Sequence, residues 1–124
     1  MKAVHLYTGD DGRSHFADLD IPMNAANSGA QSSLVPTEGV VFRETPKGSE
    51  QSFHPAPRRQ FVVTLSGQAE IECGDGSKRR FGAGDIMLAD DTTGQGHITR
   101  VLEGPRRFLF VLMPDSVDVT PWRV

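Results

Sequence analysis

Two stretches of the sequence decide the fold, residues 53–67 (FHPAPRRQFVVTLSG) and residues 81–97 (FGAGDIMLADDTTGQGH). In the first, a histidine precedes an apolar run that ends at a glycine. In the second, glycine-rich turns flank another short apolar run, and the stretch closes on a second histidine. Runs of β-branched and aromatic residues bounded by glycine are typical of short strands joined by tight turns.

The same pattern continues on both sides of these stretches. Strands are predicted where β-branched and aromatic residues concentrate, at residues 40–44, 60–66, 69–73, 78–81, 86–88, 97–103 and 107–113. Glycine-rich breaks separate them at intervals of about ten residues, which is typical of an antiparallel sandwich or barrel. Gly67, Gly82 and Gly84 are interpreted as turn residues that need a positive φ.

Composition limits the class of protein. A chain of 124 residues closes one hydrophobic core, and 13 glycines and 8 prolines fit many short strands and tight turns. The lone Cys73 has no partner for an intrachain disulfide, and no apolar run is long enough for a signal peptide or a membrane span. We therefore expect a cytoplasmic protein with no membrane partner. The net charge of −3 gives no electrostatic reason to expect nucleic acid.

The chain is divided into three parts of one domain. Residues 1–37 are predicted to be an N-terminal arm with the first strands, residues 38–113 a barrel, and residues 114–124 a C-terminal tail. Within the first part, residues 23–38 (MNAANSGAQSSLVPTE) are small and polar and are expected to form a loop or a loosely packed arm. The arm and the tail are expected to wrap outside the barrel or to reach a partner subunit.

Two predicted strands need cover on both faces. Residues 61–65 and 108–113 are apolar without alternation, which is typical of strands buried on both sides. A homodimer is the simpler explanation, and cover by the N-terminal arm is the alternative. Cys73 alternates with glutamates in its strand, so it is expected on the core side and not as a nucleophile.

The spacing of these residues resembles the first short motif of the cupin family, whose members are small β-barrels that hold a metal or a small ligand. That motif is a glycine, five residues, HxH, three or four residues, a glutamate, six residues and a glycine. Here Gly48 precedes His54 by the expected interval, and Gly67 closes the motif. Ala56 stands where the second histidine is expected, and Gln60 stands where the glutamate is expected.

The second family motif is matched less closely. It begins with a glycine and contains a histidine after a turn, and Gly84 and His97 are the natural matches. Asp90 replaces the proline of that turn, and residues 92–96 lengthen it. The resemblance covers residues 40–113 and implies an all-β, double-sheet jelly-roll barrel, also described as a double-stranded β-helix, with the N-terminal arm outside it.

The resemblance also implies a metal site. Cupins with a full set of ligands present three imidazoles and one carboxylate, so His54, Gln60 and His97 are the implied ligands of one divalent ion, iron, manganese, nickel or zinc. Two imidazoles and an amide bind such an ion more weakly than a set with a carboxylate. Asp90 or Asp91 completes the set only if the long turn folds back into the mouth of the barrel.

Arginines are expected to flank this site. A guanidinium suits carboxylates and phosphates, so Arg58, Gln60 and Arg100 are predicted to bind an anionic ligand. Strand parity favours an inward Arg58 and an outward Arg59. The alternative is a solvated basic rim paired with Asp90, Asp91 or Glu44.

Two classes of function remain open. In the first, a metal-dependent enzyme performs the oxygenase, isomerase or decarboxylase chemistry that the family resemblance suggests. In the second, a metal-free module or sensor binds a small metabolite in the barrel. The sequence contains no nucleophile elbow, phosphate-binding glycine loop or dinucleotide fingerprint. His5 and His15 match no motif and are expected to be exposed to solvent.

Overall fold

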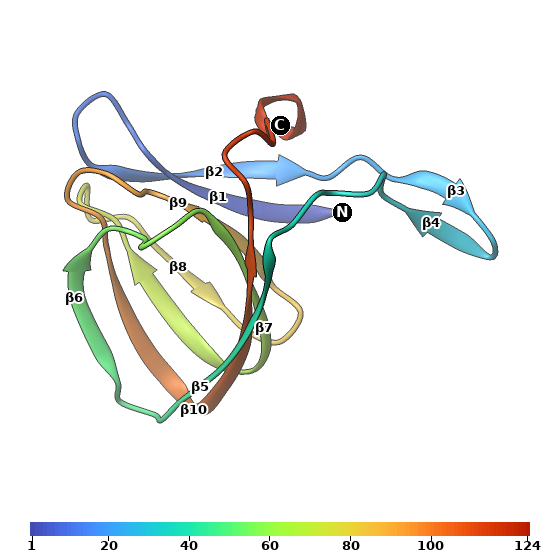
Figure 1. Cartoon of the computed structure of the whole chain (residues 1–124). Helices are drawn as coiled ribbons and strands as arrows, with labels where there is room; N and C mark the ends of the chain where they lie inside the picture. Colours follow the sequence, from blue (N-terminus) through green and yellow to red (C-terminus); the bar gives the residue numbers. More distant parts are fainter.

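The computed structural model describes all 124 residues and contains ten strands and one turn of 3₁₀ helix (Figure 1). The predicted all-β class is confirmed. The elements are β1 (Lys2–Thr8), β2 (Ser14–Asp20), β3 (Asn24–Ala26), β4 (Gly29–Gln31), β5 (Gly39–Thr45), β6 (Glu50–His54), β7 (Gln60–Glu72), β8 (Lys78–Phe81), β9 (Ile86–Asp90), β10 (His97–Leu112) and η1 (Thr120–Trp122). No helix has the length and apolar character needed to cross a membrane.

Eight strands form one sheet in the order β2-β1-β9-β7-β10-β5, with β6 beside β10 and β8 beside β7. All neighbours are antiparallel except β1 and β9, which are parallel. Figure 1 shows that the sheet curls, so that β5, β6, β7 and β10 lie around its concave side. This curl brings residues that are distant in the sequence to one concave face.

The long strands β7 and β10 produce the curl. Each was predicted as two strands separated by a turn, but each runs on through a bend, with β10 irregular between Val101 and Phe108. Gly67 lies at the bend of β7 with φ 76°, and a Cβ there would come within 2.6 Å of the Glu103 carbonyl oxygen. Glycine is therefore required by the close approach of the two strands as well as by its φ.

Gly82 and Gly84, the other two predicted turn glycines, differ in the sign of φ. Gly84 has the predicted positive φ, 87°, whereas the φ of Gly82 is not positive. Gly82 instead donates its backbone N–H to the Asp85 carboxylate at 2.7 Å. The turn at residues 82–85 therefore needs only one left-handed residue.

The N-terminal segment differs from an external arm. β1 pairs with β9, where Leu6 stands opposite Ala89, and Leu6 is completely buried. The first strands therefore belong to the sheet, because their apolar residues complete its core. Only the β3–β4 hairpin projects from the molecule as an arm (Figure 1), with nearly all of its residues exposed.

The core lies under the concave face. Its buried apolar side chains come from β1, β7, β8, β9 and β10 and from the segment before β7: Leu6, Ala56, Val62, Ile71, Cys73, Phe81, Met87, Ala89 and Phe108. Cys73 is fully buried, as predicted, and burial raises the pKa of its thiol to about 11. A thiol held neutral in this way is not a nucleophile.

The convex face of β7, β9 and β10 is covered by the chain's own ends. Phe61 and Leu88 pack with Met113 and Val119, and Trp122 stacks on Phe61 with a centroid distance of 6.4 Å. The tail thus supplies much of the cover that a second subunit was expected to give.

Part of the convex face stays open beyond the tail. Phe42 is 81% exposed, and Val40 and Leu65 are about half exposed. The homodimer stays a prediction that rests on this remaining patch.

Candidate ligand-binding pocket

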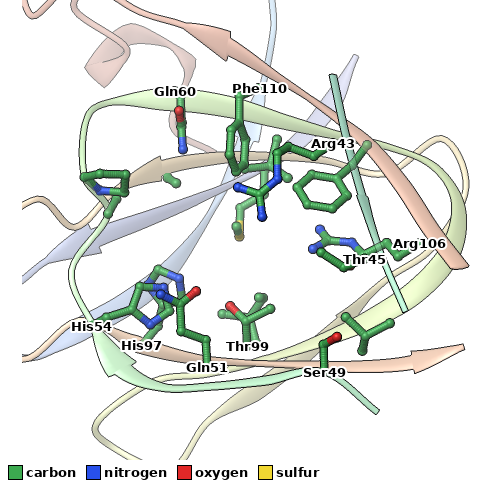
Figure 2. A pocket seen from close by; sticks show the side chains of 18 of the residues that line it. Arg43, Thr45, Ser49, Gln51, His54, Gln60, His97, Thr99, Arg106 and Phe110 are labelled. Atoms are coloured by element: carbon green, nitrogen blue, oxygen red, sulfur yellow. The ribbon is translucent and has the colours of Figure 1, made fainter. Parts of the chain in front are cut away.

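The concave face holds a cavity of about 470 Å³ (Figure 2). Strands β5, β6, β7, β9 and β10 all contribute to its wall. Its polar and charged lining residues are Arg43, Thr45, Ser49, Glu50, Gln51, His54, Gln60, His97, Thr99 and Arg106. Its apolar and proline lining residues are Ala56, Pro57, Val62, Ile71, Met87, Ala89, Val101, Phe108 and Phe110. The volume suits a small organic molecule.

Alternation along the strands selects this lining. On β10, one set of alternate residues faces the cavity before the irregular stretch and another set after it. These residues are His97, Thr99, Val101, Arg106, Phe108 and Phe110. The irregularity of β10 between Val101 and Phe108 shifts the alternation, and it thereby turns Arg106 inward and Arg107 outward.

The two motif histidines lie side by side at one end of the pocket. His54 and His97 are opposite each other on β6 and β10, and their ring centroids are 4.5 Å apart. Gly96 makes this approach possible, because a Cβ on Gly96 would come within 1.9 Å of the His54 carbonyl oxygen. The φ of Gly96, 78°, is also one that other residues rarely adopt.

Hydrogen bonds fix the orientation of both rings. Nδ1 of His97 donates to the Asp91 carboxylate at 2.6 Å, and Asp91 is completely buried behind it. Nδ1 of His54 donates to the Ser52 carbonyl oxygen at 2.7 Å. In each ring Nε2 is therefore the nitrogen that remains for the cavity.

Two arginines, both missed by the sequence analysis, lie at the other end. Arg106 is 4% exposed, and its guanidinium carbon lies 4.0 Å from the centroid of the Phe108 ring. Arg43 is exposed at the rim, with its guanidinium carbon 5.6 Å from the Phe110 ring and 5.8 Å from the Phe108 ring. Figure 2 shows both guanidinium groups across the cavity from the histidines.

Neither of these arginines forms an ion pair. The arginines that pair with carboxylates are others, namely Arg59, Arg79, Arg80, Arg100 and Arg107. Burial, together with the smaller effect of the positive charge of Arg43, lowers the pKa of Arg106 to about 10. Arg106 still carries its charge at neutral pH, so the pocket contains a buried cation without a counterion.

Several buried polar atoms near Arg106 also have no partner. They are Nε of Arg106 itself, Oγ1 of Thr45 and Oγ1 of Thr64. Thr45 stands opposite Arg106 in the β5–β10 pairing, and Thr64 stands opposite Phe108. Buried polar groups in native proteins are nearly always hydrogen-bonded, and two of these three atoms belong to residues that line the cavity, Thr45 and Arg106.

The residues do not make up the metal site that the family resemblance implies. No group of three or more His, Cys, Asp or Glu side chains is arranged to hold a metal ion. Figure 2 shows Gln60 across the cavity from His54 and His97, so the amide does not share a coordination point with the two rings. Asp91 does not complete the set, because its carboxylate bonds Nδ1 of His97 from behind.

Asp90 does not complete the metal site either, because it bonds His5 and Arg59. It accepts from His5 at 2.8 Å and lies 3.2 Å from Nε of Arg59. His5 is buried, which corrects the expectation that it is exposed, because Asp90 satisfies its Nε2. His15, expected on the same grounds to be exposed, is half-buried and bonds Asp11.

Arg58 and Arg59 do not line the pocket. Arg58 is exposed, contrary to the inward orientation predicted from parity, because β7 begins only at Gln60 and the alternation of the strand does not extend back to Arg58. Arg59 points away from the cavity as predicted, but it is buried under the C-terminal tail. There it donates to the carbonyl oxygens of Pro114, at 3.1 Å, and Val117.

Arg100 also lies outside the pocket. It has the opposite parity from His97 on β10, and its guanidinium donates to Glu72 at 2.7 Å and to Glu50 at 3.3 Å. The bond with Glu72 raises the pKa of Arg100 and lowers the pKa of Glu72. Arg100 therefore fits the alternative of a basic rim, but its partners are Glu72 and Glu50 and not Asp90, Asp91 or Glu44.

A signal for one missed arginine was present in the sequence. Arg43 falls in a predicted strand, where it has the parity of Val41 and so shares one face with it. Arg106 fell between the strands predicted at residues 97–103 and 107–113, next to the Gly104-Pro105 break, and was assigned no face. Only the pairing of β10 with β5 and β7 shows that the strand continues through this point.

Comparison with known proteins adds little about function. No family model matches the chain, and no curated protein matches it. SPY1581, a conserved protein of unknown function from Streptococcus pyogenes, is 22% identical with a TM-score of 0.45, over 67% of this chain and 82% of that one. NMB1881 from Neisseria meningitidis is 17% identical with a TM-score of 0.48, over 66% of this chain and 82% of that one. At these identities and TM-scores, neither similarity carries an argument about this chain.

Proposed function

We propose that this chain is a small barrel of the cupin type that binds a small organic anion in its concave pocket without a metal. The observation that carries the proposal is Arg106, a buried guanidinium with no carboxylate partner. A buried charge is costly unless it is paired, and a bound anion provides the missing partner. Arg43 at the rim adds a second positive charge for the same group.

The rest of the lining fits an organic molecule better than an inorganic ion. Apolar side chains from β7, β9 and β10 line the floor, including Val62, Met87 and Phe108. A carbon skeleton buries apolar surface there, which contributes roughly 25 cal/mol per Å². The amide of Gln60 offers both a donor and an acceptor to the ligand.

The cupin assignment is part of the proposal. It is supported by the arrangement of His54, Gln60 and His97, which line one cavity although they lie on three different strands. The close approach at Gly67 and the curled sheet are also compatible with it. The departures at Ala56 and Gln60 fall on the family's metal ligands, which is why the proposal is metal-free.

Thermal unfolding in the presence of organic anions tests the proposal. Matched carboxylates, phosphate esters and neutral analogues are each added to the purified protein at equal ionic strength. At least one class of organic anion is expected to raise the midpoint, since a ligand that binds only the folded state stabilises it. The proposal fails if no anion shifts the midpoint more than sodium chloride does.

Elemental analysis tests the metal-free part separately. Protein purified without chelators or a histidine tag is expected to contain far less than one equivalent of iron, manganese, nickel or zinc. A near-stoichiometric metal would favour the enzyme class instead. That result would assign His54 and His97 as ligands, with water completing the coordination sphere.

A further inference from the structure

The hydrogen-bonding roles of His54 and His97 indicate which group of the ligand lies at their end of the pocket. Asp91 is a carboxylate and the Ser52 carbonyl has no proton, so Nδ1 of His97 and Nδ1 of His54 are both donors. A neutral imidazole has only one N–H. In the neutral rings, each Nε2 is therefore a hydrogen-bond acceptor facing the cavity.

Two adjacent acceptors do not satisfy each other. The rings lie 4.5 Å apart and neither Nε2 has a protein donor within hydrogen-bonding distance. An acceptor pair of this kind needs a donor from the ligand, and an O–H group supplies one. A second carboxylate at this end would instead face lone pairs, with the buried Asp91 behind them.

The pocket is therefore polarised along its length. Nε of Arg106 is a buried donor without a partner at one end, and the Nε2 acceptors of the neutral His97 and His54 rings lie at the other end. Between them the wall is apolar and includes Ile71, Met87 and Phe110. Figure 2 shows the two ends on opposite sides of the cavity.

We propose that the ligand is a hydroxycarboxylate, with its carboxylate at Arg43 and Arg106 and its hydroxyl donating to Nε2 of His97 or His54. This inference rests on the proposed function, because it takes the anion at the arginine end as given. What the inference adds is the hydroxyl group of the ligand and its position at the opposite end from the carboxylate.

A matched ligand series tests it by calorimetric titration at neutral pH. The probes are straight-chain ω-hydroxycarboxylates from 3-hydroxypropionate to 8-hydroxyoctanoate, with the unsubstituted acid and the dicarboxylate of each length. At the best length, the hydroxy acid is expected to bind about tenfold more tightly than both analogues. Equal affinity for the hydroxy acid and the unsubstituted acid overturns the inference, and so does a preference for the dicarboxylate. If no member binds, the proposed function fails for carboxylates of this series, which is a separate result.

Variants assign the preference to the histidines. His97→Asn keeps an N–H donor for Asp91 and removes the ring nitrogen Nε2, and His54→Phe removes the second Nε2 from a half-buried position. The combined variant is expected to lose the hydroxyl preference while it still binds the unsubstituted acid. His15→Asn is the matched control, because His15 bonds Asp11 outside the pocket. Retention of the full preference in the combined variant would overturn the inference.

Discussion

Arg106 and Arg107 are neighbours in sequence but have opposite environments. Arg106 is 4% exposed, contacts the Phe108 ring and has no counterion. Arg107 has a side chain that is 65% exposed and bonds Glu44 at 2.8 Å. Charged side chains on a protein surface are normally solvated and paired loosely, as Arg107 is. An unpaired buried charge is costly to folding, so the contrast supports the proposal that the concave face binds an anion.

The largest effect should come from removing the ring that Arg106 contacts. Phe108→Ala is expected to lower the free energy of unfolding by about 3–5 kcal/mol, because Phe108 is buried in the core and leaves a cavity. Phe42→Ala on the convex face is the matched control, with an expected change within about 0.5 kcal/mol at protein concentrations low enough for the chain to be monomeric. Chemical denaturation measures both values. Equal losses would remove the distinction between the two faces.

The same control tests the homodimer. A second copy that covers Phe42 makes Phe42→Ala destabilising, and the loss should depend on protein concentration. Analytical ultracentrifugation of the wild type at micromolar concentration then shows a dimer that the variant weakens. A stable monomer would contradict the dimer prediction and leave the C-terminal tail and Val35 as the cover of this face.

The next prediction concerns stability after replacement of Arg106. Most substitutions of buried residues lower the free energy of unfolding, but this one is expected to maintain or raise it. A lowered pKa means that the folded state disfavours the charged form of Arg106, so at neutral pH its charge destabilises the fold. Arg106→Met removes that charge and also loses the contact with Phe108. We expect the ligand-free variant to match the wild type or exceed it by about 1–3 kcal/mol. Arg107→Met should stay within about 0.5 kcal/mol, and a large loss in Arg106→Met would show that the guanidinium has a structural partner.

The smallest effect concerns the partly exposed ion pair between Arg100 and Glu72 outside the pocket. The bond with Arg100 lowers the pKa of Glu72 in the folded state below its ordinary value of 4.5. The resulting stabilisation is present above that ordinary value and is lost as pH falls through the folded-state pKa. Glu72→Gln should therefore be slightly less stable than the wild type at neutral pH, and the two curves should converge in acid. Thermal unfolding between pH 7 and pH 3 measures this, and a constant difference would contradict it.

Much of the fold could be predicted from local sequence patterns. The strand predicted at residues 78–81 has the same bounds as β8, because glycine and charged residues limit it on both sides. β1 was not predicted as part of the sheet, since His5 interrupts its apolar pattern and its burial depends on Asp90, far away in the sequence. The continuity of β10 was missed because a glycine and a proline stand where the strand bends rather than ends.

The site was predictable only in part, for a related reason. His54 and His97 carry a spacing signal, and both line the cavity. The choice of Arg58 and Arg100 rested on proximity in sequence, whereas strand parity and the irregular stretch of β10 determine which arginines face inward. Long-range pairing sets both properties, and a single sequence does not encode the register of that pairing in any local pattern.

Calorimetric titration of one anion into three proteins tests the central claim most directly. The anion is the one that raises the unfolding midpoint of the wild type most in the thermal screen. The three proteins are the wild type, Arg106→Gln and Arg107→Gln. Loss of a buried charged contact should weaken binding at least about thirtyfold in Arg106→Gln, while Arg107→Gln binds like the wild type. Equal affinity in all three proteins, or a loss confined to Arg107→Gln, would contradict the account.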